Sequence, residues 1–401
     1  MLEDRAGGMS GPVSELERAC RSCFILHFIT GLETGGAEMM LYKLLLSTDQ
    51  SRLRHAVVCL TGGEAVGSRI RALGIPVHML GMKHGLPGIG TLREALRLVR
   101  LYSPDIVQGW MHHSNLFGLL VSRFGGRRAV VWNIRQALYG IEKERLAIRV
   151  VVRIGALTSR RVDRIIYNSN AGAEQHEAIG YWSGSRAILP NGFDTEKFQP
   201  DPAACFVLRE ELGLAPSQKL VGLVARFHPM KDHITFLRAA ARVVAGCPDV
   251  SFVLAGGGVD DGNAQLMRAV SELRLTPHVR LLGERDSATL MPAFDVLALS
   301  SWAEAFPNVL GEAMACGVPC VVTDVGDCAR VLGENGVVVP PRDPELLANG
   351  ILELLDLRHE ERKEMGLRAR ERVVQSYSLA SVAHQYEALY EAVHAEHVGS
   401  K

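Results

Sequence analysis

Charged side chains at two places in the second half of the chain have the types and spacing to act together. Glu304 and Glu312 belong to the stretch SSWAEAFPNVLGEAMACGVPCVVTDVG, which begins where the apolar run VLALS ends. Arg226 and Lys231 follow another apolar run, in GLVARFHPMKDHITFLRAA. Polar residues that directly follow apolar runs are good candidates for a binding site, because they lie on loops that a rigid element holds in position.

The first of these stretches predicts the start of a helix. Pro307 suits a first helical turn, so Phe306, Pro307 and Asn308 mark the expected N-terminus. Backbone N–H groups of such a turn attract anions, and a diphosphate fits there. A carboxylate beside phosphate would repel it. We therefore expect Glu304 to accept hydrogen bonds from a transferred sugar and Glu312 from a ribose.

The two basic residues fit the departure of a nucleoside diphosphate. The negative charge that develops there must be balanced by a metal ion or by fixed cations. The sequence has no Asp-x-Asp metal motif. We expect Arg226 to bind two phosphate oxygens as a fork and Lys231 to act as a point charge. This predicts sugar transfer from a nucleotide-linked donor, with no metal and no cofactor.

The elements that must position these residues are short apolar runs that alternate with longer amphipathic stretches. Runs rich in Val, Ile and Leu are typical of parallel strands buried between helices. Each half of the chain offers several: FILHFI, HAVVCL, IPVHML, DIVQGW, AVVWNI and RIIYNS, then LVGLVA, SFVLAG, VRLLG, VLALS, CVVTDV and VVVP. We expect an α/β protein with two doubly wound, Rossmann-like domains that face each other across a ligand-binding cleft.

Turn residues divide the chain into these domains. Prolines bracket an Asn-Gly turn in LPNGFDTEKFQPDP, which predicts an interdomain linker at 191–202. We expect an acceptor-side domain over 21–190 and a nucleotide-sugar-binding domain over 203–375. A C-terminal helix over 376–401 is expected to pack across both, and 1–20 to form a mobile extension.

The composition limits the partners. Basic and acidic residues balance at 44 each, so overall charge does not favour nucleic acid. No apolar run reaches the roughly 18 to 20 residues of a membrane span, and the start lacks a signal-peptide core, which predicts a cytoplasmic protein. The arginine-rich segment 142–164 allows three interpretations: peripheral contact with an anionic membrane at its inner face, an anionic acceptor, or a solvated helix face.

The stretches in the second half resemble the retaining glycosyltransferases of family 4, whose fold is called GT-B, and the resemblance covers roughly residues 23–380. The paired glutamates of that family correspond to Glu304 and Glu312, and its paired cations to Arg226 and Lys231. The resemblance implies that the cations hold the diphosphate, that Glu304 contacts the donor sugar and that Glu312 binds ribose. Ala305 replaces the usual glycine.

The first half also resembles this family. Gly35 and Gly36 in FITGLETGGAEMML are similar to its first loop, where backbone approaches the donor phosphates or the acceptor; a structural turn is the alternative. His113 lies in a segment similar to the family's H-x-N, which implies contact with the sugar or orientation of the acceptor hydroxyl. Many relatives have a histidine where this chain has Arg135.

The resemblance implies transfer of a hexose or N-acetylhexosamine from a UDP- or GDP-linked donor. The implied acceptor is a saccharide, a lipid-linked saccharide or a polysaccharide precursor. Two alternatives stay open: a nucleotide-sugar 2-epimerase of the same architecture, and a non-catalytic carbohydrate-binding protein. The paired glutamates and cations favour transfer over both.

Overall fold

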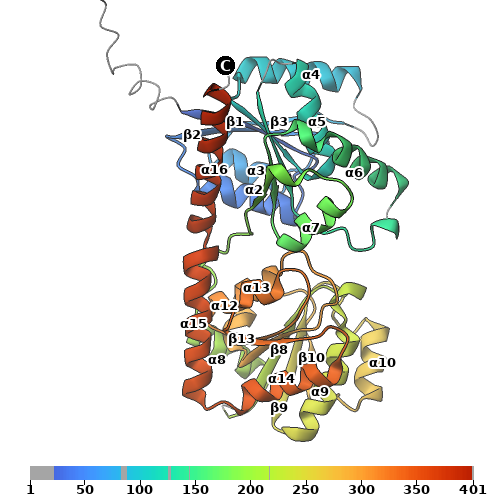
Figure 1. The fold of residues 1–401 in the computed structure, drawn as a ribbon. Helices are drawn as coiled ribbons and strands as arrows, with labels where there is room; N and C mark the ends of the chain where they lie inside the picture. Colours follow the sequence, from blue (N-terminus) through green and yellow to red (C-terminus); the bar gives the residue numbers. More distant parts are fainter. Residues whose placement is uncertain (1–21, 83–87, 125–127, 144, 216, 400–401) are drawn as a thin grey trace, which may run out of the picture.

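The computed structural model describes residues 22–82, 88–124, 128–143, 145–215 and 217–399. Two α/β halves lie one above the other, and a pair of long C-terminal helices runs along one side of both (Figure 1). The predicted extension at 1–20 lies outside the described residues. No helix within the described ranges combines the length and the apolar character that a membrane crossing requires.

The first half contains a parallel seven-stranded sheet of order β3-β2-β1-β4-β5-β6-β7. Its strands are β1 (Cys23–Ile29), β2 (Leu53–Cys59), β3 (Val77–Met79), β4 (Ile106–Trp110), β5 (Ala129–Ile134), β6 (Arg164–Tyr167) and β7 (Arg186–Ile188). Six were predicted and are confirmed. The edge strand β7 was missed, since it has three residues and one of them is Arg186.

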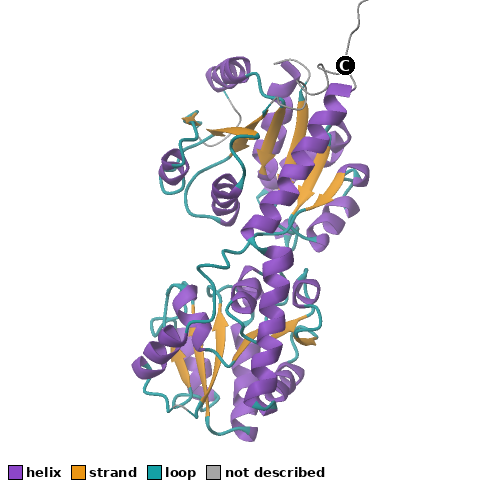
Figure 2. Cartoon of the chain, turned by 90° about the vertical axis from the view of Figure 1, so that its left-hand side faces the viewer, coloured by secondary structure: helices purple, strands orange, loops and turns teal. Residues whose placement is uncertain are grey.

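The second half contains a parallel six-stranded sheet of order β10-β9-β8-β11-β12-β13, whose six strands match the predicted apolar runs. Its strands are β8 (Lys219–Val224), β9 (Val250–Ala255), β10 (Val279–Leu281), β11 (Val296–Leu299), β12 (Cys320–Thr323) and β13 (Gly336–Val339). Strands β1 and β9 are buried at every residue. Helices cover both faces of each sheet, which explains why the strands are continuous apolar runs (Figure 2).

The helices follow the strands in alternation. In the first half they are α2 (Gly36–Ser47), α3 (Gly67–Ala72), α4 (Ile89–Tyr102), α5 (Met111–Phe124), α6 (Leu146–Thr158) and α7 (Asn170–Ala178). In the second half they are α8 (Pro202–Glu211), α9 (His233–Gly246), α10 (Ala264–Glu272), α11 (Ser287–Leu290), α12 (Asn308–Ala315), α13 (Cys328–Leu332) and α14 (Pro344–Asp356). The chain ends with α15 (His359–Tyr377) and α16 (Leu379–Gly399).

The chain passes between the two halves twice, and the two crossings are hydrogen-bonded to each other. The Phe193 N–H donates to the Tyr377 carbonyl at 2.8 Å, and the Leu379 N–H donates to the Phe193 carbonyl at 2.9 Å. Beyond this point α16 returns to the first half, where Tyr386 and Tyr390 are buried in its core. The domain limits themselves remain predictions.

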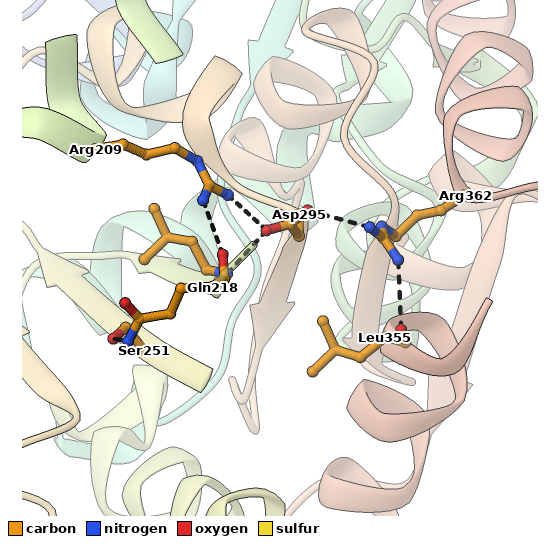
Figure 3. Close-up of polar contacts among 7 residues, drawn as sticks. Arg209, Gln218, Ser251, Asp295, Leu355 and Arg362 are labelled. Carbon is orange, nitrogen blue, oxygen red and sulfur yellow. Dashed lines mark hydrogen bonds and ion pairs between the residues drawn. The ribbon is translucent and has the colours of Figure 1, made fainter. Parts of the chain in front are cut away.

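Aspartates that precede strands fix the start of each sheet. Asp105 accepts a hydrogen bond from the Phe24 N–H, and Asp295 accepts one from the Leu220 N–H, each at 2.9 Å. Asp295 also lies between two guanidinium groups (Figure 3), from Arg209 at 2.7 Å and from Arg362 at 3.3 Å. These contacts tie β8 and β11 to α8 and α15.

We expect Asp295→Ala to destabilise the second half strongly. The carboxylate is 18% exposed and Arg362 is 5% exposed, so its removal leaves two largely buried cations without their acidic partner. Loss of one member of a buried ion pair costs about 3–5 kcal/mol in free energy of unfolding. Urea unfolding measures the loss. The control is Glu94→Ala, which breaks an exposed pair with Arg97 and should change little. Equal effects of the two variants would contradict this assignment.

Candidate active site

A cavity of about 700 Å³ lies between the two halves, at the carboxyl ends of both sheets. The first half lines it with Gly36, residues 135–141, Ile148, Asn168 and Asn191. The second half contributes Arg226, residues 228–231, residues 302–306 and Asn308. The cavity therefore gathers five of the predicted residues from the second half: Arg226, Lys231, Glu304, Phe306 and Asn308.

Lys231 and Glu304 form an ion pair inside this cavity. The Lys231 ammonium donates to Glu304 Oε1, and the Ser301 hydroxyl donates to the same oxygen at 2.7 Å. Lys231 ends a short turn over 229–231 that follows β8, and its carbonyl accepts from the Ser300 hydroxyl at 2.8 Å. The structure thus brings one predicted cation and one predicted carboxylate into direct contact.

Arg226 lies on the wall of the same cavity, just after β8. Burial, and then the positive charges of Arg226 and Lys231, lower the pKa of His228. The ion pairs of the described residues do not include Arg226, whereas Lys231 is neutralised by Glu304. Arg226 is therefore a cation of this wall whose charge has no carboxylate partner within the described part of the chain.

The predicted helix start lies at the edge of the cavity, within the expected range 306–308. α12 begins at Asn308, and Pro307 is its N-cap residue and makes no side-chain cap. Phe306 is buried and stacks on Phe193, with ring centroids 6.0 Å apart. Asn191 Nδ2 donates to Asn308 Oδ1 at 2.5 Å, which joins the first interdomain crossing to the start of this helix.

Glu312 lies in the second turn of α12 and faces a second cavity of about 300 Å³ between the two halves. The Ser287 hydroxyl donates to Glu312 Oε2 at 3.0 Å. Burial raises the pKa of the Glu312 carboxyl, and the nearby Lys43 partly opposes this. The cavity is also lined by Gly35, Gly36 and Lys43 from the first half.

Lys43 is a residue of this second cavity that the sequence interpretation missed. It lies on α2, where Gly36, Met39, Met40 and Lys43 line the cavity together. Their spacing of i, i+3, i+4 and i+7 places them on one helix face. That spacing is the signal that could have identified Lys43 once the Gly-rich turn was recognised as a helix start. Burial lowers the pKa of Lys43.

Gly35 and Gly36 mark the start of α2, as expected for the first loop. Gly35 is the N-cap, and a Cβ there would lie 2.2 Å from the Glu38 carboxylate. Gly36 lines both cavities, and a Cβ there would meet nothing within 4 Å. Gly35 thus gives room to the Glu38 carboxylate, the flexible end of a side chain that could shift aside, while Gly36 keeps backbone open toward the cleft.

His113 lies on the first turn of α5, where its side chain is exposed, and it is absent from the described walls of both cavities. Asn115 is buried, and its Oδ1 accepts from the Asn133 N–H at 3.3 Å. Gly109 packs against Asn115 so closely that a Cβ would lie 2.4 Å from its Cα. Asn115 therefore joins α5 to β5, and the role of His113 remains a prediction.

Arg135 follows β5 and reaches the wall of the large cavity. Its guanidinium donates to Asn133 Oδ1 at 3.2 Å, to the Tyr386 hydroxyl at 2.8 Å and to Asn191 Oδ1. All of these acceptors are neutral. Arg135 thus links the first sheet, the interdomain crossing and α16.

One cluster in the described residues has side chains of metal-ligand type: Cys23, Asp105 and His394. It lies at the amino ends of the strands, opposite to the cavities. Asp105 already accepts from the Phe24 N–H. Burial raises the pKa of the Cys23 thiol to about 12, with Asp105 adding to the shift. Without a metal ion the thiol therefore stays protonated, and a metal would have to displace this proton to bind.

Comparison with known proteins connects both halves to one family. The family model described as Glycosyltransferase Family 4 matches residues 34–197, and the model described as Glycosyl transferases group 1 matches residues 218–357. The putative glycosyltransferase EpsF of Bacillus subtilis is 28% identical over 316 residues, which cover 75% of this chain and 79% of that protein. N-acetyl-alpha-D-glucosaminyl L-malate synthase of Bacillus anthracis is 32% identical over 186 residues, which cover 46% of this chain and 48% of that protein.

Solved structures show the same architecture. Anabaena HepE in complex with UDP aligns with a TM-score of 0.80 and 24% identity, over 92% of this chain and 99% of that chain. WaaG, a glycosyltransferase of lipopolysaccharide biosynthesis, aligns with a TM-score of 0.67 and 14% identity, over 91% and 99%. At these identities the likeness establishes the fold. With the two family models, it shows that the chain belongs to the family 4, group 1 glycosyltransferases, enzymes of the GT-B fold that use nucleotide-sugar donors.

Proposed function

We propose that this enzyme transfers a hexose or N-acetylhexosamine, with retention at the anomeric carbon and without a metal ion, from a UDP- or GDP-linked donor. The observation that supports this is the shared cavity of Arg226, Lys231 and Glu304 beside the first turn of α12. The proposed acceptor is a saccharide, a lipid-linked saccharide or a polysaccharide precursor. The cytoplasmic location stays a prediction.

In this proposal the donor diphosphate lies between the two cations and the start of α12. Phe306 and Asn308 supply backbone N–H groups there, Pro307 has no N–H and only shapes the turn, and Arg226 supplies the fork for two phosphate oxygens. Lys231 exchanges part of its contact with Glu304 for a phosphate oxygen. Glu304 then accepts hydrogen bonds from the sugar hydroxyls.

The ribose and the acceptor occupy the two sides of this arrangement. Glu312 and Gly35 belong to the smaller cavity, where the ribose hydroxyls bind the carboxylate. The acceptor enters the larger cavity from the side of residues 135–141, and His113 stays a candidate for its orientation. The bond from the anomeric carbon to the phosphate oxygen breaks as the acceptor oxygen bonds to the same face. The departing phosphate takes the acceptor proton.

UDP-glucose is the first donor to test, because Anabaena HepE was solved in complex with UDP and with UDP-glucose. We expect UDP release that depends on a saccharide acceptor and that survives EDTA, since fixed cations replace the ion. The NMR coupling of the anomeric proton in the product reports retention. A panel with GDP-mannose and UDP-N-acetylglucosamine covers the remaining donors.

Three outcomes would contradict this proposal. Activity lost in EDTA and restored by Mg²⁺ or Mn²⁺ would show that the cations do not suffice. Conversion of one nucleotide sugar into its 2-epimer would indicate the isomerase alternative. Nucleotide-sugar binding without turnover on any acceptor would favour the non-catalytic alternative.

We expect Glu312→Gln to weaken binding of the donor nucleotide by about one to two orders of magnitude. The substitution removes the charge and one acceptor oxygen, and hydrogen bonds to a charged acceptor contribute roughly 1.5–3 kcal/mol. Because burial raises the pKa of Glu312, wild-type affinity should fall as the pH is lowered and the carboxyl protonates, and the variant should lose this dependence. Isothermal titration with UDP measures both.

Two comparisons control for an indirect effect of this substitution. Glu360→Gln changes an exposed glutamate on α15 and should bind UDP like the wild type. A 2′,3′-dideoxy nucleotide lacks the hydroxyls that Glu312 binds, so it should bind wild type and Glu312→Gln almost equally. If ribose and dideoxyribose forms differ as much in the variant as in the wild type, the ribose assignment is wrong.

A further inference from the structure

The outer face of α6 carries an apolar row that no other element of the described residues covers. Its members follow one another at helical spacing and are 71%, 46%, 43% and 82% exposed: Leu146, Val150, Ile154 and Leu157. Single exposed apolar residues are common, but a continuous row on one helix face is typical of an interaction surface. α6 lies at the outer edge of the first half, on the side away from α15 and α16 (Figure 1).

A basic row runs beside the apolar row on the same helix. Arg145, Arg149 and Arg153 are exposed and follow one another at a spacing of four residues. The ion pairs of the described residues do not include these three arginines. The charge continues at Arg160, whose guanidinium lies 4.3 Å from the ring centre of Trp182, itself 39% exposed.

The opposite face of α6 reaches the candidate active site. Val152 and Ala156 pack in the core of the first half. Ile148 lines the large cavity together with Leu138, Tyr139 and Ile141. The helix therefore separates the exposed rows from an apolar wall of the cavity. The exposed face and the cavity wall lie within one helix diameter of each other.

We propose that α6 docks this enzyme on an anionic membrane surface. The apolar row enters the boundary between headgroups and acyl chains, and the arginine row lies at the headgroup phosphates. Trp182 and Arg160 extend the contact, since tryptophan is favoured at a membrane interface. This goes beyond the proposed function and rests on it in one respect: the apolar cavity wall next to α6 then receives a lipid-linked acceptor.

The chemistry of the two rows distinguishes a membrane from other partners. A second copy of the chain that met this face with its own α6 would bring the two arginine rows together, where their charges repel. A nucleic acid would satisfy the arginines but leave the leucines in water. A bilayer with anionic headgroups satisfies both rows at once.

Vesicle co-sedimentation of the full chain tests the proposal. We expect binding to vesicles of phosphatidylcholine with about 30% phosphatidylglycerol, and weak binding to phosphatidylcholine alone, since each arginine near an anionic surface adds attraction. Leu146→Ser/Leu157→Ser and Arg149→Gln/Arg153→Gln should each lower the partition coefficient about tenfold or more. Leu367→Ser on α15 and Arg268→Gln on α10 are matched controls and should bind like the wild type.

Each remaining outcome would overturn the proposal. If the wild type does not bind anionic vesicles, α6 is not a membrane-docking surface. Loss of binding in the arginine variant but not in the leucine variant indicates a polyanion surface without insertion, such as one for nucleic acid. A thermal shift with UDP is measured on every variant: preserved stability and UDP binding show that the fold and donor site are intact, so failure of docking is distinguishable from failure of the proposed function.

Discussion

Parallel strands cannot be joined by tight turns, and this constraint determines where the chemistry of this protein lies. Each strand is followed by a loop and a helix that returns to the other end, so all such loops leave one edge of the sheet. Both sheets are parallel throughout, and their carboxyl edges face each other. The Gly35–Gly36 turn, the segment after β5 and the loops after β8 and β11 therefore meet in one cleft, although they lie far apart in sequence.

Charge in that cleft is arranged for a ligand that is strongly negative. Lys231 is held by Glu304, a carboxylate that is itself fixed by Ser301. This pairing limits the cost of a partly buried ammonium group when no ligand is bound. Arg226 stays outside the ion pairs of the described residues, and Arg135 contacts neutral acceptors. The cleft thus keeps positive charge available, while hydrogen bonds hold its groups in place before a donor arrives.

The sequence predicts the strands well because buried parallel strands are continuous apolar runs, and it fails where this pattern is interrupted. β7 is three residues long and begins with an arginine, so it resembles a loop. Lys43 was missed although its spacing on α2 places it on the face of Gly36, because that local pattern does not report that Lys43 lies near the charge of Glu312 in the other half. His113 follows β4 as expected, but the turn at Met111, with φ of 67°, leaves its side chain exposed. A sequence motif therefore predicts which loop contributes to the site, whereas the backbone conformation determines which side chain of that loop points into the cleft.

The double crossing between the halves also determines how this protein can be divided. The first half is continuous in space but not in sequence, because Tyr386 and Tyr390 of α16 complete its core. A fragment that ends at the first crossing would lack α16, so the apolar surface that Tyr386 and Tyr390 cover would be exposed to water. The end of α16 lies near the start of β1, since His394 and the Phe24 N–H both contact Asp105. A circular permutant in which α16 leads directly into β1 would gather the whole first half into one stretch of chain, ready for separate expression or for insertion into another protein.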